Sequence, residues 1–353
     1  MYLKLNSELS RWQKYAVIFS ITLLTIFLLL FLAIWVIFPI VFMNNISVQA
    51  SSIFLNIDNP SRPDFDNPAK YDLDGTVNFF ITTNNTDGNS VAIGTWLILP
   101  ENQQNMSVGL HSAGELLANT SYPVLLYMHG VYANRAKPIY AYKALRKQFI
   151  IIAIDYRGFG DSSNLQPSEL GIVNDTIQIY EWIRNNTQNE IYIWGHSLGS
   201  ALATHVVRKL REEHDIIPMG LFLESPLTTL REAMPKHPIG KLFSWLAYFD
   251  ETFLNPLEKN GFHFRTSTNI LYVDCPIMIL HAKDDDVVPW EFGSKLTKLA
   301  LERRCIEAQG DVIYYQFDEK FGYNHMHITT DPHLNVYIRT FLDECRRMNR
   351  MVR

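Results

Sequence analysis

A short strand that turns directly into a helix at a serine constrains this chain more than any other feature. Residues 190–194 are β-branched and aromatic and predict a buried strand, while the spacing from Ala201 predicts a helix to about Glu213. Between them, Gly195-His-Ser197-Leu-Gly199 fits the pattern G-x-S-x-G. So abrupt a turn forces the serine into a strained backbone, and the flanking glycines are needed because a Cβ there would collide with the turn. The segment therefore predicts that Ser197 is a nucleophile held at the N-terminus of a helix.

The N-terminal region contains a long uncharged segment, residues 16–43, which predicts a transmembrane signal-anchor behind a tail of residues 1–15. A helix from Ala16 to Phe38 would be about 34 Å long, enough to cross a bilayer, and we expect Pro39 to stop or bend it. The alternatives are a buried helix of a soluble protein and a cleaved signal peptide, since Val48-Gln49-Ala50 resembles a cleavage site. The apolar run is longer than the core of a typical signal peptide, which favours the uncleaved anchor.

The charges that flank this segment predict its orientation. Lys4, Arg11 and Lys14 precede it, and no basic residue follows it until Arg62. The positive-inside rule then leaves a cytosolic tail and places the rest of the chain in a lumen or outside the cell. Six N-x-S/T motifs for glycosylation agree with that side of the membrane. Their asparagines are Asn45, Asn84, Asn105, Asn119, Asn174 and Asn185.

Length and composition set broad limits. The 353 residues, 47% of them hydrophobic, suffice for one membrane segment and one large domain with a sizeable core. The net charge of −5, without a basic stripe, gives no indication of a nucleic-acid partner. The three cysteines, Cys275, Cys305 and Cys345, form neither a metal motif nor a disulfide framework, and their odd number leaves at least one free thiol or an intermolecular bond.

The order of the predicted elements indicates the fold class. After a linker over residues 44–72, rich in Pro, Asn and Asp, the alternation of strands and helices over residues 73–353 predicts an α/β domain with a parallel, doubly wound sheet. It begins with an antiparallel hairpin, and we expect the polar residues 101–120 to form a surface insertion. The predicted strands are 74–83, 91–99, 123–128, 149–155, 190–196, 219–224, 276–281 and 312–317, and the predicted helices are 137–148, 172–186, 200–213, 290–303 and 335–348.

A serine hydroxyl becomes a nucleophile only beside a positioned base, and the base needs an acid partner to orient it. On a sheet of this kind the chain order is Ser, then Asp or Glu, then His. Asp285 follows the strand 276–281, and its D-x-x-V-P spacing from Val288-Pro289 selects it as the acid. The alternatives that remain open are Asp284, Asp286 and Glu224.

The base is expected in the loop after the strand that ends near Phe317. His325, three residues past Gly322, is the candidate, and His327 is the alternative. Most of the other histidines are expected to have structural or surface positions: His111, His196, His205, His214, His237, His263 and His281. An oxyanion needs backbone donors, for which we expect the N–H groups of Leu198 and Val131, the second lying just after Gly130. This chemistry requires no metal and no organic cofactor.

The segment 227–272 interrupts the alternation and is too long for an ordinary connection. It follows the strand that ends at Glu224, where hydrolases of this architecture insert a lid. Two interpretations of its aromatic side chains remain open: they pack a small core of the insertion, or they line an acyl site. These residues are Phe243, Trp245, Tyr248, Phe249, Phe253, Phe262 and Phe264.

Several motifs together resemble the α/β-hydrolase-domain-containing protein 12 family over roughly residues 75–345. They are His129-Gly130, Asp155-Tyr-Arg-Gly-Phe-Gly-Asp161-Ser162, Tyr192-Ile-Trp-Gly-His-Ser-Leu-Gly199, Leu223-Glu-Ser-Pro226, His281-Ala-Lys-Asp-Asp-Asp-Val-Val-Pro289 and Gly322-Tyr-Asn-His325. The resemblance implies an α/β-hydrolase fold and a membrane-anchored serine hydrolase of the endoplasmic reticulum with a lumenal active site. It also implies lysophosphatidylserine and monoacylglycerols as substrates and gives Ser197, Asp285 and His325 the triad roles. One departure is Val131-Tyr132-Ala133, where the family has Asn-Ala-Gly, which alters the loop but keeps a backbone N–H.

We therefore expect a carboxylic-ester hydrolase that cleaves single-chain lipids, lysophospholipids or monoacylglycerols, through an acyl-enzyme on Ser197. The alternatives are an acyl-protein thioesterase or a serine peptidase of the same fold and, in another class, an inactive lumenal binding module. The expected partners are the lipid substrate and the membrane that the N-terminal helix crosses. Endoplasmic reticulum membrane is the expected location, with the plasma membrane and an extracellular domain as the alternative.

Overall fold

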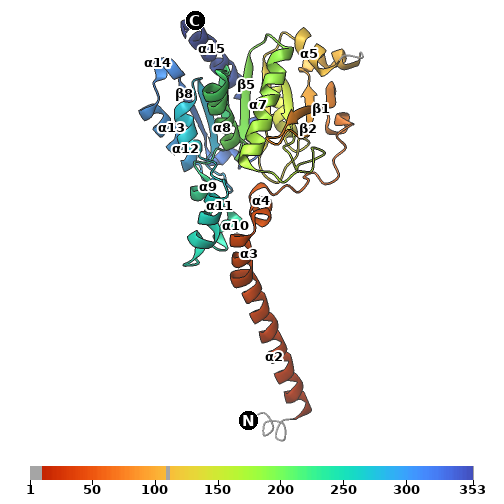
Figure 1. The fold of residues 1–353 in the computed structure, drawn as a ribbon, viewed down its shortest axis with the longest axis vertical. Coiled ribbons are helices and arrows are strands. Elements are labelled where there is room, and N and C mark those ends of the chain that lie inside the picture. Colours follow the sequence, from red (N-terminus) through yellow and green to blue (C-terminus); the bar gives the residue numbers. More distant parts are fainter. Residues whose placement is uncertain (1–9, 109–111, 353) are drawn as a thin grey trace.

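The computed structural model describes residues 10–108 and 112–352; Lys4 and His111 lie outside these ranges. One sheet of eight strands forms the centre of the domain, in the order β1-β2-β4-β3-β5-β6-β7-β8 (Figure 1). Strand β2 is antiparallel to β1 and β4, and the other neighbours are parallel, which confirms the predicted fold class and its antiparallel start. The strands are β1 Thr76–Asn84, β2 Ser90–Ile98, β3 Val124–Met128, β4 Ile150–Ile154, β5 Ile191–His196, β6 Gly220–Glu224, β7 Ile277–Ala282 and β8 Val312–Phe317.

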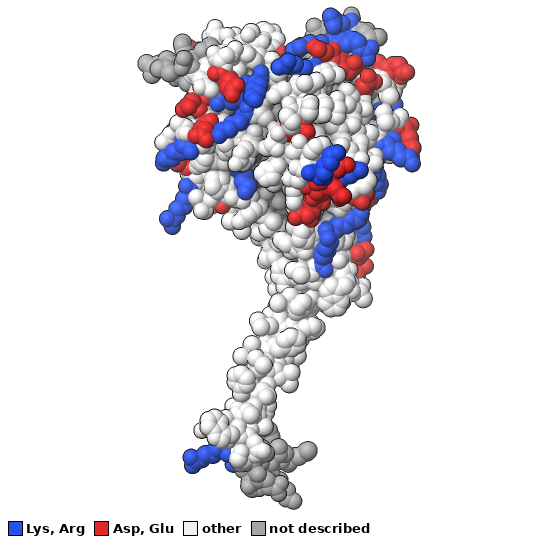
Figure 2. Space-filling model, turned by 180° about the vertical axis from the view of Figure 1, so that it is seen from behind, with Lys and Arg blue, Asp and Glu red and all other residues white. Residues whose placement is uncertain are grey.

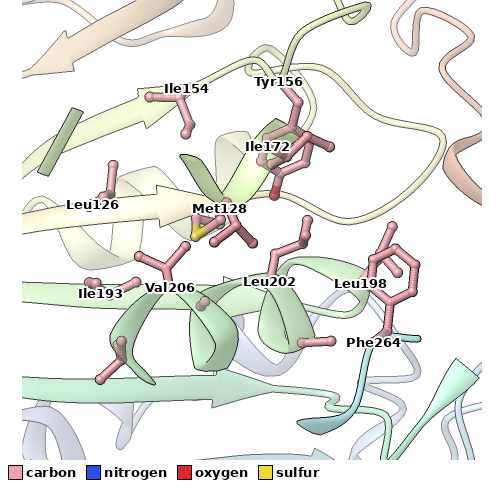
Figure 3. Packing of buried hydrophobic residues seen from close by; sticks show 14 of the residues in the cluster. Leu126, Met128, Ile154, Tyr156, Ile172, Ile193, Leu198, Leu202, Val206 and Phe264 are labelled. Atoms are coloured by element: carbon pink, nitrogen blue, oxygen red, sulfur yellow. The ribbon is translucent and has the colours of Figure 1, made fainter. Parts of the chain in front are cut away.

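Helices cover both faces of the sheet, because alternate side chains of a strand point to opposite faces. In β5, Ile193 packs in one core cluster with Val206 of α8 (Figure 3), while Tyr192 and Trp194 pack in a second cluster with Phe341 of α15. Because both faces of the sheet are covered, the central strands are continuous runs of buried apolar residues. The helices of the domain are α5 Ala113–Asn119, α6 Ile139–Leu145, α7 Glu169–Asn186, α8 Leu198–His214, α13 Glu291–Arg303, α14 Ile306–Gln309 and α15 Leu334–Val352.

An apolar helical rod projects from the domain (Figure 1) and is formed by α2 (Arg11–Leu32), the π-helical turn η1 (Ala33–Ile37) and α3 (Phe38–Asn44). An 18-residue stretch within these 34 residues has a mean hydropathy of 3.0, and on the face in Figure 2 the rod shows Lys or Arg only near its far end. Its length and composition suit one membrane crossing. Of the expected stop or bend at Pro39, the stop is wrong: Pro39 lies in the first turn of α3, directly after the π-helical turn, and the helix continues to Asn44.

The predicted linker is wrong over its first part, since Ile46–Phe54 forms the helix α4. Asn45 caps it, its side-chain oxygen accepting hydrogen bonds from the N–H groups of Ser47 and Val48. One face of α4 is buried in the core through Ala50, Ile53 and Phe54. The chain after the membrane segment is therefore packed against the domain. A short 3₁₀ turn, η2 (Pro68–Tyr71), follows before β1.

Two insertions lie outside the alternating pattern. Residues 101–120 contain the 3₁₀ segment η3 (Glu101–Val108) and α5, whose Leu116 and Leu117 are buried, so this insertion is packed on the domain rather than being a purely surface loop. The segment 227–272 consists of short helical pieces below the sheet edge (Figure 1). These are α9 Leu230–Ala233, α10 Pro238–Lys241, η4 Asp250–Leu254, α11 Asn255–Lys259, α12 Thr266–Asn269 and η5 Ile270–Tyr272.

The aromatic side chains of 227–272 divide between the two interpretations. Phe262 and Phe264 pack edge-on against Phe54 of α4 and belong to the core (Figure 3 shows Phe264 beside Leu198). Three others, Phe243, Phe249 and Phe253, line a cavity beside Ser197. Trp245 and Tyr248 are exposed.

Candidate active site

The backbone at Ser197 has the strained conformation that the motif predicts. Its φ of 55° and ψ of −122° lie outside the regions that L-residues ordinarily occupy, at the point where β5 ends and α8 begins. A Cβ on Gly195 would lie 2.4 Å from the carbonyl oxygen of Gly199, and one on Gly199 would lie 2.2 Å from that of Met128. Both positions therefore require glycine. Ser197 sits at the N-terminus of a 17-residue helix, where negative charge is favoured.

His325 and Asp285 form a hydrogen-bonded pair. The Nδ1 of His325 lies 2.8 Å from the Oδ2 of Asp285, whose side chain is fully buried. The other oxygen of Asp285 accepts hydrogen bonds from the N–H groups of Val287 and Val288, at 2.9 and 2.8 Å. Burial acts to raise the pKa of Asp285, but hydrogen bonds from His281 and His325 outweigh it and hold that pKa well below its usual range. Asp285 is thus a fixed anion beside His325.

The alternative residues occupy other positions. Asp284 accepts a hydrogen bond from the N–H of Asn324 at 2.9 Å, and Asp286 is exposed at a cavity edge. Glu224 is buried, accepts a hydrogen bond from the indole of Trp194 at 2.9 Å, and has its pKa raised by burial to about 8. His327 has its ring against Tyr140, 5.9 Å between centroids. The geometry therefore pairs His325 with Asp285 among the candidates.

His196, the residue before the nucleophile, supports the loop that carries His325. Its Nε2 lies 2.9 Å from the backbone oxygen of His325, and burial lowers its pKa to about 3. A neutral ring can donate this hydrogen bond throughout the physiological range. This agrees with the structural position that the sequence predicted for it.

Two cavities meet at Ser197. One, of about 140 Å³, is lined almost entirely by apolar side chains, among them Leu198, Phe249 and Phe253. The other, of about 660 Å³, carries polar groups, including His325, Lys137 and Asp286. The larger volume is in the range of small-molecule sites. Ser197 therefore lies between a small apolar cavity and a larger one whose lining is mostly apolar but includes several charged and polar side chains.

The two expected oxyanion donors lie near the serine. Leu198 follows Ser197 directly, and Val131 lines both cavities. A Cβ on Gly130 would lie 3.0 Å from the Cβ of Ser197, so glycine lets this loop approach the nucleophile. The next residue of the loop, Tyr132, has a φ of 50°, an uncommon conformation for a bulky side chain. The loop in which this chain departs from the resembled family thus forms part of the cavity surface.

Two residues at the cavities were missed by reasoning from the sequence. His237 lines both cavities, and its Nδ1 accepts a hydrogen bond from the N–H of Ile239 at 3.3 Å. Burial and the neighbouring His325 lower the pKa of His237. Lys137, which lies after the β3 loop, lines the larger cavity. A single histidine in an insertion and a single lysine before a helix carry no local pattern that could have indicated this.

Comparisons with known proteins identify the fold and the family of the chain. A family model described as alpha/beta hydrolase fold matches residues 123–247. The chain is 34% identical to lysophosphatidylserine lipase ABHD12 of Xenopus tropicalis over 328 residues, 90% of this chain and 82% of that protein. It is 30% identical to protein ABHD12B of Homo sapiens, over 76% of this chain and 73% of that one.

Among solved structures, an alpha-beta hydrolase from Vibrio vulnificus superposes with a TM-score of 0.57 at 16% identity, covering 86% of this chain and 91% of that one. The Pyrococcus furiosus esterase Pf2001 gives a TM-score of 0.51 at 15% identity, with 80% and 92% covered. At such identities the likeness shows the fold alone.

Proposed function

Since the chain belongs to the lysophosphatidylserine lipase ABHD12 family of α/β hydrolases, a family of lysophospholipid lipases, we propose that it is a membrane-anchored serine hydrolase of single-chain lipids. Its substrates would be lysophosphatidylserine or another lysophospholipid, and monoacylglycerol. The reaction is hydrolysis of the acyl ester, without a metal or cofactor. The N-terminal helix would hold the domain at the membrane where these lipids partition.

The proposed mechanism uses Ser197, His325 and Asp285 in turn. His325 accepts the hydroxyl proton as Ser197 attacks the ester carbonyl, and the N–H groups of Val131 and Leu198 stabilise the oxyanion. Collapse of this intermediate expels the alcohol, which takes the proton from His325, and leaves an acyl-enzyme. Water activated by the same histidine then releases the fatty acid. The buried anion of Asp285 keeps Nδ1 of His325 protonated and stabilises its cationic form.

The observation that carries the proposal is the meeting of the two cavities at Ser197. A lysophospholipid has an apolar chain on one side of its ester and a polar head on the other, so its ester would lie at the serine with the chain in the apolar cavity and the head in the larger cavity, which holds Lys137 and Asp286. The peptidase alternative needs no such arrangement, whereas an acyl-cysteine peptide also joins an apolar chain to a polar part, so the thioesterase is distinguished by the assay below. The apolar side supports acyl substrates, since each buried methylene contributes about 0.8 kcal/mol.

Chain-length and head-group dependence test this proposal. With the full-length chain purified in detergent, we expect kcat/KM for oleoyl lysophosphatidylserine and monooleoylglycerol to exceed that for p-nitrophenyl acetate roughly 100-fold or more. Two-chain phosphatidylserine should be a poor substrate, because the serine adjoins one apolar cavity. Similar efficiency for acetyl and oleoyl esters would contradict the lipid assignment, and preference for an acyl-cysteine peptide would favour the thioesterase.

The charged group in the larger cavity adds a variant to the same assay. Lys137 is the lysine that lines it, so we expect Lys137→Met to lower kcat/KM for anionic lysophosphatidylserine several-fold more than for neutral monooleoylglycerol. An equal effect on both lipids would mean that Lys137 does not contact the head group.

We further propose that the catalytic domain lies in the lumen of the endoplasmic reticulum. Four of the six glycosylation asparagines are exposed, Asn174 is half-buried, and the side chain of Asn105 is outside the described part. When the chain is made in human cells, glycosidase should increase its gel mobility, and protease added to intact microsomes should spare residues 60–353. Digestion of the domain in sealed microsomes would overturn this orientation. If the plasma-membrane alternative holds, the domain of intact cells should instead be accessible to surface labelling. The exposed asparagines are Asn45, Asn84, Asn119 and Asn185.

A further inference from the structure

We propose that the end of the membrane helix forms one wall of the acyl-binding cavity, so that the anchor is part of the substrate site as well as a tether. The proposal concerns α3 and its residues Phe38 and Phe42, and it rests on the proposed function, because it assumes that an acyl chain occupies the apolar cavity beside Ser197. It assigns to the anchor a direct contact with substrate.

Aromatic packing joins α3 to the insertion. The ring centroid of Phe42 lies 4.8 Å from that of Phe253, and Phe42 is only 1% exposed. Phe38 lies 5.4 Å from Phe243 and 6.1 Å from Phe253. Distances of this size are those of interacting aromatic pairs. The membrane helix and the segment 227–272 thus share one aromatic cluster.

Hydrogen bonds fix the helix in this position. The indole of Trp35 donates to the backbone oxygen of Leu242 at 3.3 Å, and the hydroxyl of Tyr248 donates to the backbone oxygen of Trp35. On the other side, the amide of Gln49 in α4 donates to the backbone oxygen of Phe42 at 2.8 Å. The amide of Asn260, in the insertion, donates to Gln49 at 2.7 Å. These bonds hold α3, α4 and the insertion as one packed unit.

The cavity extends from the nucleophile to the anchor. Phe38 and Phe42 line the same cavity as Ser197 and Leu198. Its volume of about 140 Å³ is close to the roughly 150 Å³ of an engineered cavity that holds one benzene ring. A long acyl chain therefore needs more room than the cavity offers, and its distal part must continue beyond the lining residues.

The continuation that the structure offers is the exposed apolar surface of the rod. Ile37 and Val41, neighbours of the lining residues on the same helix, are 55% and 42% exposed. In the membrane these side chains face lipid, so an acyl tail that leaves the cavity past α3 stays in an apolar environment throughout. The tail would then run from Ser197 along α3 toward the bilayer.

A tethered photo-crosslinker tests the proposal on the full-length chain in detergent micelles. The probe is a sixteen-carbon alkyl fluorophosphonate with a diazirine near the end of the chain. Ser197 would displace fluoride from phosphorus, which fixes the chain in the cavity before irradiation. We expect mass spectrometry to find adducts in residues 34–44. A matched probe with the diazirine beside the phosphorus should instead label residues near Ser197.

The controls separate the possible outcomes. Adducts that persist in Ser197→Ala, or spread evenly over residues 15–44, reflect detergent partitioning and would overturn the proposal. Adducts confined to 227–272 would also overturn it while leaving the proposed function intact. A wild-type chain that does not react with the probe would instead contradict the proposed function itself.

A substitution that fills part of the cavity provides a second test that does not depend on crosslinking. Phe38→Trp adds volume to the cavity wall, and we expect kcat/KM for an eighteen-carbon lysophospholipid to fall about tenfold relative to an eight-carbon one. The control is Phe27→Trp in α2 of the same rod, where the side chain is 66% exposed and is not among the residues that line the cavity. An unchanged chain-length profile in Phe38→Trp would contradict a substrate contact at this position.

Discussion

Replacing Ser197 by alanine is expected to reduce ester hydrolysis to background and to abolish labelling by a fluorophosphonate probe. The reason is that the hydroxyl is the attacking group, so no other residue can form the acyl-enzyme. Turnover is measured with monooleoylglycerol and labelling by in-gel fluorescence. The variant should keep the wild-type melting midpoint, which shows that the loss is chemical. Substantial turnover in a folded Ser197→Ala variant would exclude this mechanism.

Replacing the catalytic acid partner or the base should lower kcat by a similar factor. We expect His325→Ala and Asp285→Asn each to lower kcat on the order of 10⁴-fold, the first by removing the base and the second by disturbing the tautomer and orientation of its ring. The matched controls replace neighbouring residues that the structure places outside the pair of His325 and Asp285. Asp286→Asn, His327→Ala and Glu224→Gln should each be far milder. A larger loss in one of these controls would move the role to that residue.

Local chain geometry explains why the sequence predicted these positions. Ser197 belongs to a motif in which strand, turn and helix follow one another in the sequence, and both glycines of the motif are sterically required. The D-x-x-V-P spacing selected Asp285 because its carboxylate accepts the N–H groups two and three residues later, which makes a turn recognisable in the sequence. The contact with His325 spans 40 residues, but both lie after neighbouring strands, β7 and β8. Parallel strands bring their following loops to one edge.

The features that the sequence did not predict depend on tertiary contacts. Helix α4 is only nine residues long, too short to be stable alone, so its stability comes from the buried face that Ile53 and Phe54 present to the core. His237 reaches the active site only because the insertion folds over Ser197. The continuation of the membrane helix past Pro39 could not be inferred because proline in a first helical turn and proline at a helix end look alike in sequence.

A buried ion cluster beneath the active-site loops has a large expected effect on stability. Arg135, which follows the loop of Gly130 and Val131, is fully buried, and its guanidinium contacts both Asp155 and Asp161, with a 2.9 Å hydrogen bond to the latter. Asp155 is itself fully buried. Taking the cation away leaves a buried anion without its main partner, a change that typically costs about 3–5 kcal/mol.

Arg135→Met should therefore lower the melting midpoint of the full-length chain by roughly 10 °C, measured by tryptophan fluorescence in detergent. Asp155→Asn should lower it less, because Asp161 still pairs with the arginine and the asparagine oxygen can still accept from the N–H of Arg135. The surface control is Lys298→Met, which breaks a 3.9 Å pair between two exposed side chains and should change the midpoint by less than about 2 °C. A wild-type midpoint in Arg135→Met would mean that Asp155 is protonated or hydrated when unpaired. We expect the melting midpoint to fall most in Arg135→Met, less in Asp155→Asn and least in Lys298→Met, because the changes in this order leave less and less uncompensated charge inside the protein.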